Sequence, residues 1–320
     1  MRLSHLALLG ALMATPAVAA AQSFSFVAMG DAPYQLPAGI GQFERLIERI
    51  NTQQPAFSLH VGDIKSGSTR CDDAHFELIQ GLFAKLRQPM VYTPGDNEWT
   101  DCHRPDNGGY DPLERLAKLR AMFFASPDRS HGQQAMKLES QGSDPKFAKF
   151  VENARWEKNG VHFASVHVVG SNNNLQRNPA AIGEYIERNA ANIAWINSSF
   201  AQAMQSGAKA VVIAFQADPW FNLPDAREDQ RSGFSDTIQA LKTNVARFGK
   251  PVLIVHGDQH RLLIDKPLQV AGRTLHNATR LMVYGDRDVH GVLVSVDPAD
   301  PDVFSFRSMT VTANLPAPPK

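Results

Sequence analysis

Three short apolar segments in the first hundred residues each end at an aspartate. The segments FSFVAMGD, FSLHVGD and PMVYTPGDNE lead directly to Asp31, Asp63 and Asp96. Open α/β sheets bind ligands beyond the carboxyl ends of their strands, so carboxylates delivered there by neighbouring strands should converge on one point. We therefore expect a site for hard divalent cations at this edge of the sheet.

A fourth apolar segment, KPVLIVHGDQH, ends at Asp258 and adds His256 and His260. A set of carboxylate and imidazole ligands suits Mn, Zn or Fe, whereas a structural zinc site would be built on cysteines. The combination predicts a catalytic metal site. His256 either belongs to this site or is a histidine buried inside its strand.

Strand and helix patterns alternate along the whole chain. Apolar residues at helical spacing follow each of the first two strands, which predicts a βαβαβ unit with right-handed crossovers. The Asn159-Gly160 turn predicts a hairpin that opens a second sheet, and further helices are expected at 181–206 and 235–248. The fold class is therefore α/β.

The N-terminus carries Arg2, an apolar run to about Ala20 and small residues before Gln22. This pattern predicts a signal peptide over residues 1–21 and a periplasmic or secreted protein. No other stretch approaches the roughly 20 apolar residues of a membrane span. No low-complexity linker divides the remainder, so we expect one domain over 22–312 and a disordered tail over 313–320.

Charge is balanced at 32 basic and 32 acidic residues, with no basic stripe. Binding to a nucleic-acid backbone normally requires such an excess of positive charge, so this class of protein is excluded. The expected partner is a small molecule, and the sequence does not indicate an oligomeric state.

Cys71 and Cys102 are the only cysteines, and each follows one of the strand-end aspartates within eight residues. Export to an oxidising compartment favours a disulfide between them, which would pin two loops of the site together. The alternative is a pair of free buried thiols, which the polar surroundings TRCDD and TDCHR argue against.

The order and content of these strand ends resemble the calcineurin-like metallophosphoesterase superfamily, over residues 24 to about 295. Its motifs are matched by the Gly-Asp pairs at 30–31 and 62–63, by PGDNE at 94–98 and by GDQH at 257–260. The resemblance implies a two-sheet αββα sandwich and a metal-dependent phosphoesterase. It also implies that Asp63 bridges two metal ions.

Several positions depart from the family pattern. Pro33 stands where the family has a histidine, and Asn97 stands at another histidine position. Gln216 replaces the family's lone strand-end histidine, and Asp258 replaces the first histidine of the last motif. All of these residues except Pro33 still offer oxygen, which indicates a site adapted to harder ions.

The resemblance leaves the number of metal ions at one or two, chosen from Mn, Fe, Zn, Mg and Ca. A first position would use Asp31, Asp63 and His260. A second position would use four residues, namely Asp63, Asp96, Gln216 and Asp258. Tyr34 either replaces the missing ligand at Pro33 or packs over the loop.

Asn97 bears on catalysis, because an amide donates a hydrogen bond but cannot titrate as a general acid. His103 and Arg104 either take over proton delivery and phosphate binding or form a surface pair beside the disulfide. Three functions remain. The first is a phosphoesterase with a metal-activated water as nucleophile. The second is a non-catalytic relative that binds a metal or a phosphorylated ligand. The third is a metal hydrolase of non-phosphate esters.

Overall fold

The computed structural model describes residues 22–175, 177–221 and 232–316. The predicted signal peptide lies outside the described residues, as do residues 317–320. Within the described ranges, no helix is both long and apolar enough to cross a membrane.

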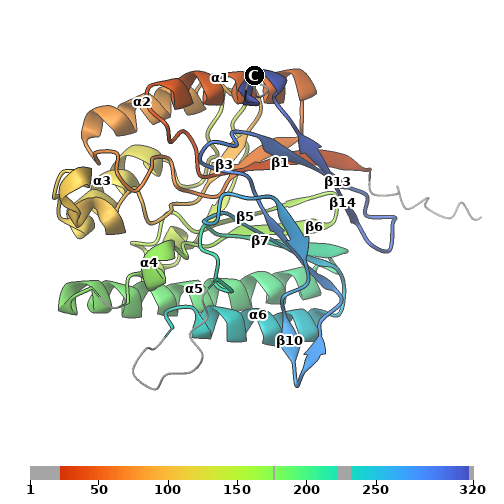
Figure 1. Cartoon of the computed structure of the whole chain (residues 1–320). Helices are drawn as coiled ribbons and strands as arrows, with labels where there is room; N and C mark the ends of the chain where they lie inside the picture. Colours follow the sequence, from red (N-terminus) through yellow and green to blue (C-terminus); the bar gives the residue numbers. More distant parts are fainter. Residues whose placement is uncertain (1–21, 176, 222–231, 317–320) are drawn as a thin grey trace, which may run out of the picture.

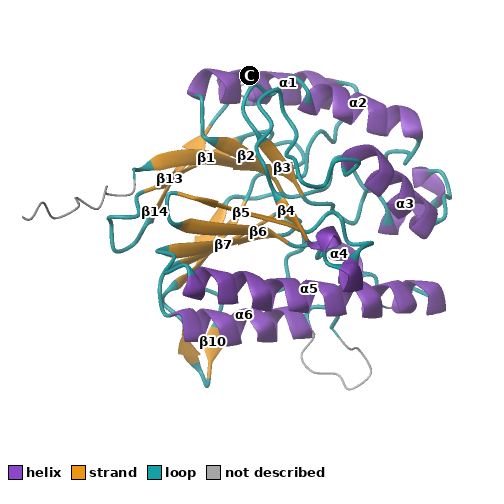
Figure 2. Cartoon of the chain, turned by 180° about the vertical axis from the view of Figure 1, so that it is seen from behind, coloured by secondary structure: helices purple, strands orange, loops and turns teal. Residues whose placement is uncertain are grey.

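Two β-sheets pack face to face and helices cover both outer faces (Figure 1). The view from behind shows the same four layers, with α1 and α2 on one side and α5 and α6 on the other (Figure 2). The described helices are α1 Ala38–Gln53, α2 Asp73–Phe83, α3 Pro112–Phe123, α4 Gly170–Asn173, α5 Pro179–Gln205 and α6 Ser235–Phe248. This arrangement confirms the predicted αββα sandwich in a single domain.

The first sheet has the strand order β14-β13-β1-β2-β3. Strands β1, β2 and β3 run parallel, as the predicted βαβαβ unit requires, and β13 joins β1 antiparallel. The strands are β1 Phe24–Met29, β2 Phe57–His60, β3 Met90–Tyr92, β13 Gly291–Val296 and β14 Phe304–Met309. The parallel strands therefore bring their carboxyl ends to one edge.

The second sheet has the order β4-β5-β6-β7-β8-β12-β9, in which β6, β7, β8 and β12 run parallel. Its strands are β4 Glu139–Ser140, β5 Ala154–Lys158, β6 Val161–Ser165, β7 Ala210–Ala214, β8 Val252–His256, β9 Leu263–Asp265 and β12 Ala278–Met282. A separate hairpin pairs β10 Gln269–Val270 with β11 Arg273–Thr274. The antiparallel pair β5 and β6 confirms the hairpin predicted at Asn159-Gly160.

Three apolar layers hold the sandwich together. Phe26, Phe57 and Phe163 are fully buried between the two sheets. A second cluster lies between the first sheet and helices α1 and α2, and a third lies between the second sheet and helices α5 and α6. Alternate residues of a strand face opposite sides, so each central strand contributes to two of these layers.

Helix starts follow the local sequence. Asn178 caps α5 through a hydrogen bond from the main-chain nitrogen of Ala181 (2.8 Å), and Pro179 occupies the first turn. Asp111 and Pro112 form the same arrangement at α3. These caps fix where the two helices begin, and α5 starts two residues before the predicted position 181.

The prediction of a disordered tail from residue 313 is wrong at its start. Thr312–Asn314 form a 3-10 turn, and the side chain of Asn314 is buried. Its amide donates hydrogen bonds to the main-chain oxygens of Val289 (2.8 Å) and Gln42 (3.0 Å). A buried amide with these partners fixes the chain to α1, which the polar, proline-rich sequence did not reveal.

Candidate metal centre

Three of the six predicted metal ligands meet between the two sheets. Asp31 follows β1, Asp63 follows β2 and His260 follows β8, and one ligand atom of each lies within 4.8 Å of the others. Asp31 and Asp63 are almost fully buried, whereas His260 is about a third exposed. The carboxyl ends of strands from both sheets thus build the site, as the sequence predicted.

The backbone is unusual at each of these ligands. Asp31, Asp63 and His260 have positive φ values of 49°, 56° and 58°. Non-glycine residues rarely adopt the left-handed region, and such strain is concentrated at functional sites. The turn after each strand therefore directs a polar side chain back toward the gap between the sheets.

Two glycines of the Gly-Asp pairs have a packing reason. A Cβ atom added to Gly95 would lie 2.0 Å from Asp63 Oδ1, and one added to Gly257 would lie 2.0 Å from Asp31 Oδ2. Only glycine leaves room at these two positions for the carboxylate of the neighbouring strand end. In each Gly-Asp pair, the aspartate is a candidate site residue, and the glycine leaves space for the aspartate of a neighbouring strand end.

The carboxyl groups carry an electrostatic cost without a cation. Burial is the main cause that raises the pKa of Asp31 and of Asp63 well above the usual range, and the charges of neighbouring acidic groups raise both further. Asp31 Oδ2 is buried and has no hydrogen-bond partner. A divalent cation would satisfy this atom and neutralise the pair, so the residues present fit a metal ion.

His260 completes the candidate set. Its Nε2 lies 3.5 Å from Asp31 Oδ1, and its ring meets the edge of Tyr34 at a centroid distance of 5.1 Å. Burial lowers the pKa of His260, which favours the neutral imidazole that binds metals.

Tyr34 contacts the site through its hydroxyl group rather than by packing alone. The hydroxyl donates a hydrogen bond to Asp63 Oδ2 (2.7 Å), and the Asn97 amide donates to both the Tyr34 hydroxyl and Asp63 Oδ2 (2.8 Å each). Burial and the charge of Asp63 raise the pKa of Tyr34 well above its usual value, so it remains a donor. Asn97 thus lies in the site, as the resemblance implied.

The other three predicted ligands lie close by but outside this cluster. Asp96 accepts a hydrogen bond from the Ser171 hydroxyl (2.9 Å). The Gln216 amide donates to Asp258 Oδ1 (3.2 Å), and the main-chain nitrogen of Asp258 donates to Asp31 Oδ1 (2.9 Å). The structure thus separates the predicted ligands into a converging group and a hydrogen-bonded group.

The short segment α4 and the residue after it form a left-handed turn that contacts Asp96 and Gln216. Four successive residues, Ser171 to Asn174, have φ values between 48° and 63°. The fully buried guanidinium of Arg188 fixes this turn, because Nη1 donates to Asn173 Oδ1 (2.6 Å) and Nη2 donates to the Asn173 carbonyl (3.0 Å). Arg188 Nε also forms an ion pair with Glu184 Oε1 (2.6 Å).

Two residues of the site were missed by the sequence analysis. Glu98 Oε1 accepts hydrogen bonds from the Gly95 nitrogen (2.6 Å) and the Tyr92 hydroxyl (2.7 Å). Lys65 is fully buried, and its Nζ donates to the carbonyl oxygens of Asn97 (2.6 Å) and Ser66 (2.9 Å). A charged residue within three positions of a strand-end aspartate was the available signal for both.

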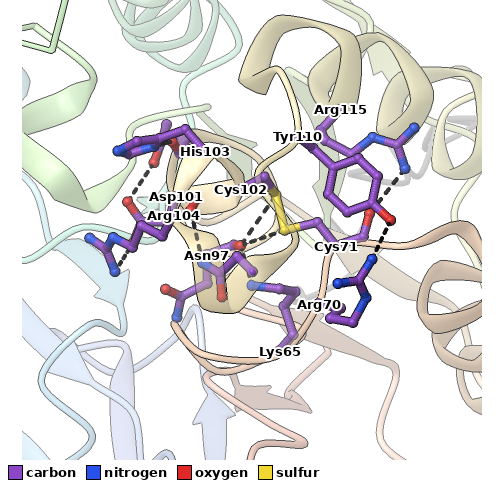
Figure 3. Close-up of a disulfide and its surroundings, with 12 residues drawn as sticks. Lys65, Arg70, Cys71, Asn97, Asp101, Cys102, His103, Arg104, Tyr110 and Arg115 are labelled. Carbon is purple, nitrogen blue, oxygen red and sulfur yellow. Dashed lines mark hydrogen bonds and ion pairs between the residues drawn. A yellow bond between two sulfur atoms is a disulfide. The ribbon is translucent and has the colours of Figure 1, made fainter.

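The predicted disulfide between Cys71 and Cys102 is present and buried. It links the loop after β2 to the loop after β3, and Figure 3 shows Lys65 and Asn97 beside it. The Asn97 carbonyl oxygen lies 3.6 Å from Cys71 Sγ. The cross-link therefore joins the two loops, as predicted.

His103 and Arg104 lie on the same loop (Figure 3). Arg104 Nη1 pairs with Asp101 Oδ2 (2.8 Å), while 46% of its side chain is exposed. A Cβ atom at Gly67 would lie 3.3 Å from Arg104 Nη1 and 3.1 Å from Asn97 Oδ1, so both groups border the same space. His103 is exposed, and its Nδ1 lies 2.8 Å from the Thr100 carbonyl oxygen.

His256 has the environment of a buried strand histidine. Its ring stacks on Phe215 (6.0 Å) and lies near Trp220 (5.8 Å), on the helix-covered side of the second sheet. Burial lowers its pKa to about 3. It does not join the three converging ligands, so this predicted site residue packs in the core instead.

Comparison with solved structures places this arrangement in a known fold. The structure superposes on a dimetal phosphatase from Danio rerio with a TM-score of 0.54 and 11% identity, over 90% of this chain and 99% of that one. It superposes on the purple acid phosphatase PPD1 from yellow lupin seeds with a TM-score of 0.53 and 11% identity, over 90% of this chain and 54% of that one.

The fold is shared with these two phosphatases. No family model matches the sequence, and no curated protein matches it by sequence. At 11% identity the two structural neighbours establish the architecture alone. They do not establish the reaction.

Proposed function

We propose that the protein is a divalent-cation-dependent phosphoesterase that hydrolyses phosphate mono- or diesters. One observation carries the proposal. Asp31, Asp63 and His260 bring three ligand atoms within 4.8 Å of one another at the strand ends of a metallophosphoesterase fold. A cation held there would supply Lewis-acid polarisation of the phosphoryl group and a bound water of lowered pKa.

The side chains around this position have defined tasks. Asp63 is fixed by the Tyr34 hydroxyl and the Asn97 amide, so its orientation toward a cation is set before substrate arrives. Arg104 is anchored to Asp101 and keeps donor groups exposed at the rim of the site. Its planar fork matches the oxygens of a phosphate ester.

Asn97 limits the choice of substrate. Its amide can donate to a phosphoryl oxygen but cannot supply a proton to the departing alcohol. Esters whose leaving group is stable as an anion, such as p-nitrophenyl phosphates, should therefore react fastest. His103 is the nearby residue of the loop that can carry a proton.

The experiment is hydrolysis of mono- and bis-p-nitrophenyl phosphate by purified protein, stripped of metal and then reloaded separately with Mn, Zn, Mg, Ca or Fe. Turnover that returns with a cation and is absent from Asp63→Ala supports the proposal. Cation uptake without turnover on either ester contradicts it.

A second candidate is a non-catalytic relative that binds a cation or a phosphorylated ligand. It is favoured by Asn97, which stands at the position of a family histidine and directs its amide to Asp63 and Tyr34. For this function, the same titrations should give a ligand-dependent rise in melting temperature without product.

We further propose export to the periplasm or the medium. The N-terminal sequence pattern and the buried disulfide support this, since disulfides persist in oxidising compartments. Mass spectrometry of the protein from fractionated cells should find a chain that lacks about the first 21 residues, as expected for a cleaved signal peptide. An uncleaved chain in the cytoplasm would contradict export.

A further inference from the structure

We infer that the site holds one divalent cation, at Asp31, Asp63 and His260, and that the protein's own hydrogen bonds close the place of a second cation. The inference rests on the proposed function, because it concerns the same site. The dimetal phosphatase of similar fold makes a second cation the natural expectation. The residues that would hold it here do not fit that role.

Asp258 lies outside the three converging ligands, and both of its oxygens accept hydrogen bonds from the protein. Its Oδ1 accepts from the Gln216 amide (3.2 Å), and its Oδ2 accepts from the main-chain nitrogen of Asp218 (3.0 Å). Its own nitrogen donates to Asp31 Oδ1. Asp258 therefore braces the first position from outside rather than building a second one.

Gln216 presents the wrong atom. Its Oε1, the only atom of the amide that binds hard cations, accepts a hydrogen bond from the main-chain nitrogen of Gly170 at 2.6 Å. The nitrogen end faces Asp258. Both contacts fix the same amide orientation, and the side chain is fully buried, so rotation would leave two buried groups without partners.

Asp96 is held by the left-handed turn. The single Ser171 hydroxyl proton lies between Asp96 Oδ2 (2.9 Å) and Asp101 Oδ1 (2.8 Å), and a Cβ atom at Gly170 would lie 2.7–2.8 Å from both oxygens of Asp96. The backbone of Gly170 thus covers the carboxylate. Because non-glycine residues rarely adopt the left-handed region, a turn of four such residues persists only where its surroundings hold it firmly.

Asp63 Oδ1 accepts one hydrogen bond, from the main-chain nitrogen of Asn97 (3.2 Å), and keeps a lone pair for the first cation, whereas Oδ2 accepts two. The Tyr34 hydroxyl has one proton, which it donates to this oxygen, so the Asn97 amide nitrogen must face both atoms. An oxygen that accepts two hydrogen bonds is a poor bridging ligand. The buried ammonium group of Lys65 donates to the Asn97 carbonyl oxygen. It places a positive charge next to Asn97 and Asp63 without a second metal ion.

The test measures metal content rather than activity. Purified wild-type protein is stripped with a chelator and titrated with Mn²⁺, and the bound ions are counted by native mass spectrometry and by elemental analysis. We expect one ion per chain. Two ions per chain, or none, would overturn the inference.

A matched pair of variants locates the ion. His260→Ala should weaken Mn²⁺ binding by more than about 100-fold, because even the loss of residues that only support metal ligands costs about 10–100-fold. Gln216→Met keeps the side-chain volume but offers no oxygen, and it should still bind one ion. Loss of an ion in Gln216→Met, with cooperative unfolding retained, contradicts the inference.

Turnover of bis-p-nitrophenyl phosphate is recorded on the same samples. One ion without turnover supports the single site and contradicts the proposed function. Two ions with turnover would contradict the single site and support the proposed function. The two proposals can therefore be rejected independently.

Discussion

Asp31 and Asp258 both follow central parallel strands, and they are directly connected by a hydrogen bond, yet their carboxylates differ. Asp31 Oδ2 is buried without a partner, whereas both oxygens of Asp258 accept hydrogen bonds from the protein. The strand end alone therefore does not make a ligand. Asp31 thus keeps an oxygen that a cation could satisfy, whereas the protein already satisfies both oxygens of Asp258.

The largest effect should come from the converging ligands. Asp63→Ala removes a carboxylate from this group, so Mn²⁺ affinity should fall by at least about 100-fold and turnover should be lost. Calorimetric titration and kcat/KM measure the two. Asp258→Asn, which keeps the volume and one carbonyl oxygen, is the control and should lower affinity by about tenfold, the low end of the range for residues that only support metal ligands. Equal losses in both variants would remove the distinction between the two carboxylates.

A substitution of Arg188 tests what holds the left-handed turn at 171–174 in place. Replacement by Met leaves Glu184 and the carbonyl of Asn173 without their buried partner, so the free energy of unfolding should fall by about 3–5 kcal/mol. Urea denaturation measures this. The exposed Arg247→Met is the control and should stay within about 0.5 kcal/mol of wild type. A stable Arg188→Met protein would show that the left-handed turn holds itself.

The pH dependence of stability tests whether His256 is buried in the core rather than solvated at the site. Its folded-state pKa of about 3 lies below the unfolded value of 6.5, so its contribution to stability is present above pH 6.5 and is lost as pH falls toward 3. Below pH 6.5, wild type should lose about 1.4 kcal/mol per pH unit relative to His256→Phe. Parallel stability curves from thermal unfolding between pH 7 and 5 would place His256 in a solvated environment instead.

The smallest expected effect concerns Tyr34. Tyr34→Phe removes the hydroxyl group that orients Asp63, and Mn²⁺ affinity should fall about tenfold. Tyr110→Phe removes a hydroxyl whose partner is the exposed Arg70, and should leave affinity unchanged. If Tyr34→Phe instead bound a second ion, the hydroxyl would be shown to exclude it.

Much of the fold was predictable because its signals are local. Strand-to-aspartate segments, helical spacing and the Asn159-Gly160 turn each act within about ten residues, and the structure confirms the elements they predict. The disulfide was also predictable, since both cysteines follow strand ends at one edge of the sheet. Asn314 was missed, because its partners on α1 and before β13 are distant in sequence.

The site was predictable only in part. Residue types and strand ends identified Asp31, Asp63 and His260. They do not reveal that the side-chain oxygen of Gln216 and both carboxylate oxygens of Asp258 already have hydrogen-bond partners. Those partners include Gly170 and Asp218, on other loops. Tyr34 shows the same limit, because its hydroxyl reaches a residue 29 positions away.

The left-handed turn at 171–174 has a consequence for sequence variation. Asparagine, aspartate and glycine tolerate this backbone better than other residues do, and Asn172 and Asn173 also use their side chains to bond Gly233. Substitutions that are harmless on most surface loops should therefore be rejected here. A library of random replacements at 172–174, selected for folded protein, should return mainly asparagine, which makes this segment a conservative stretch in an otherwise adaptable loop.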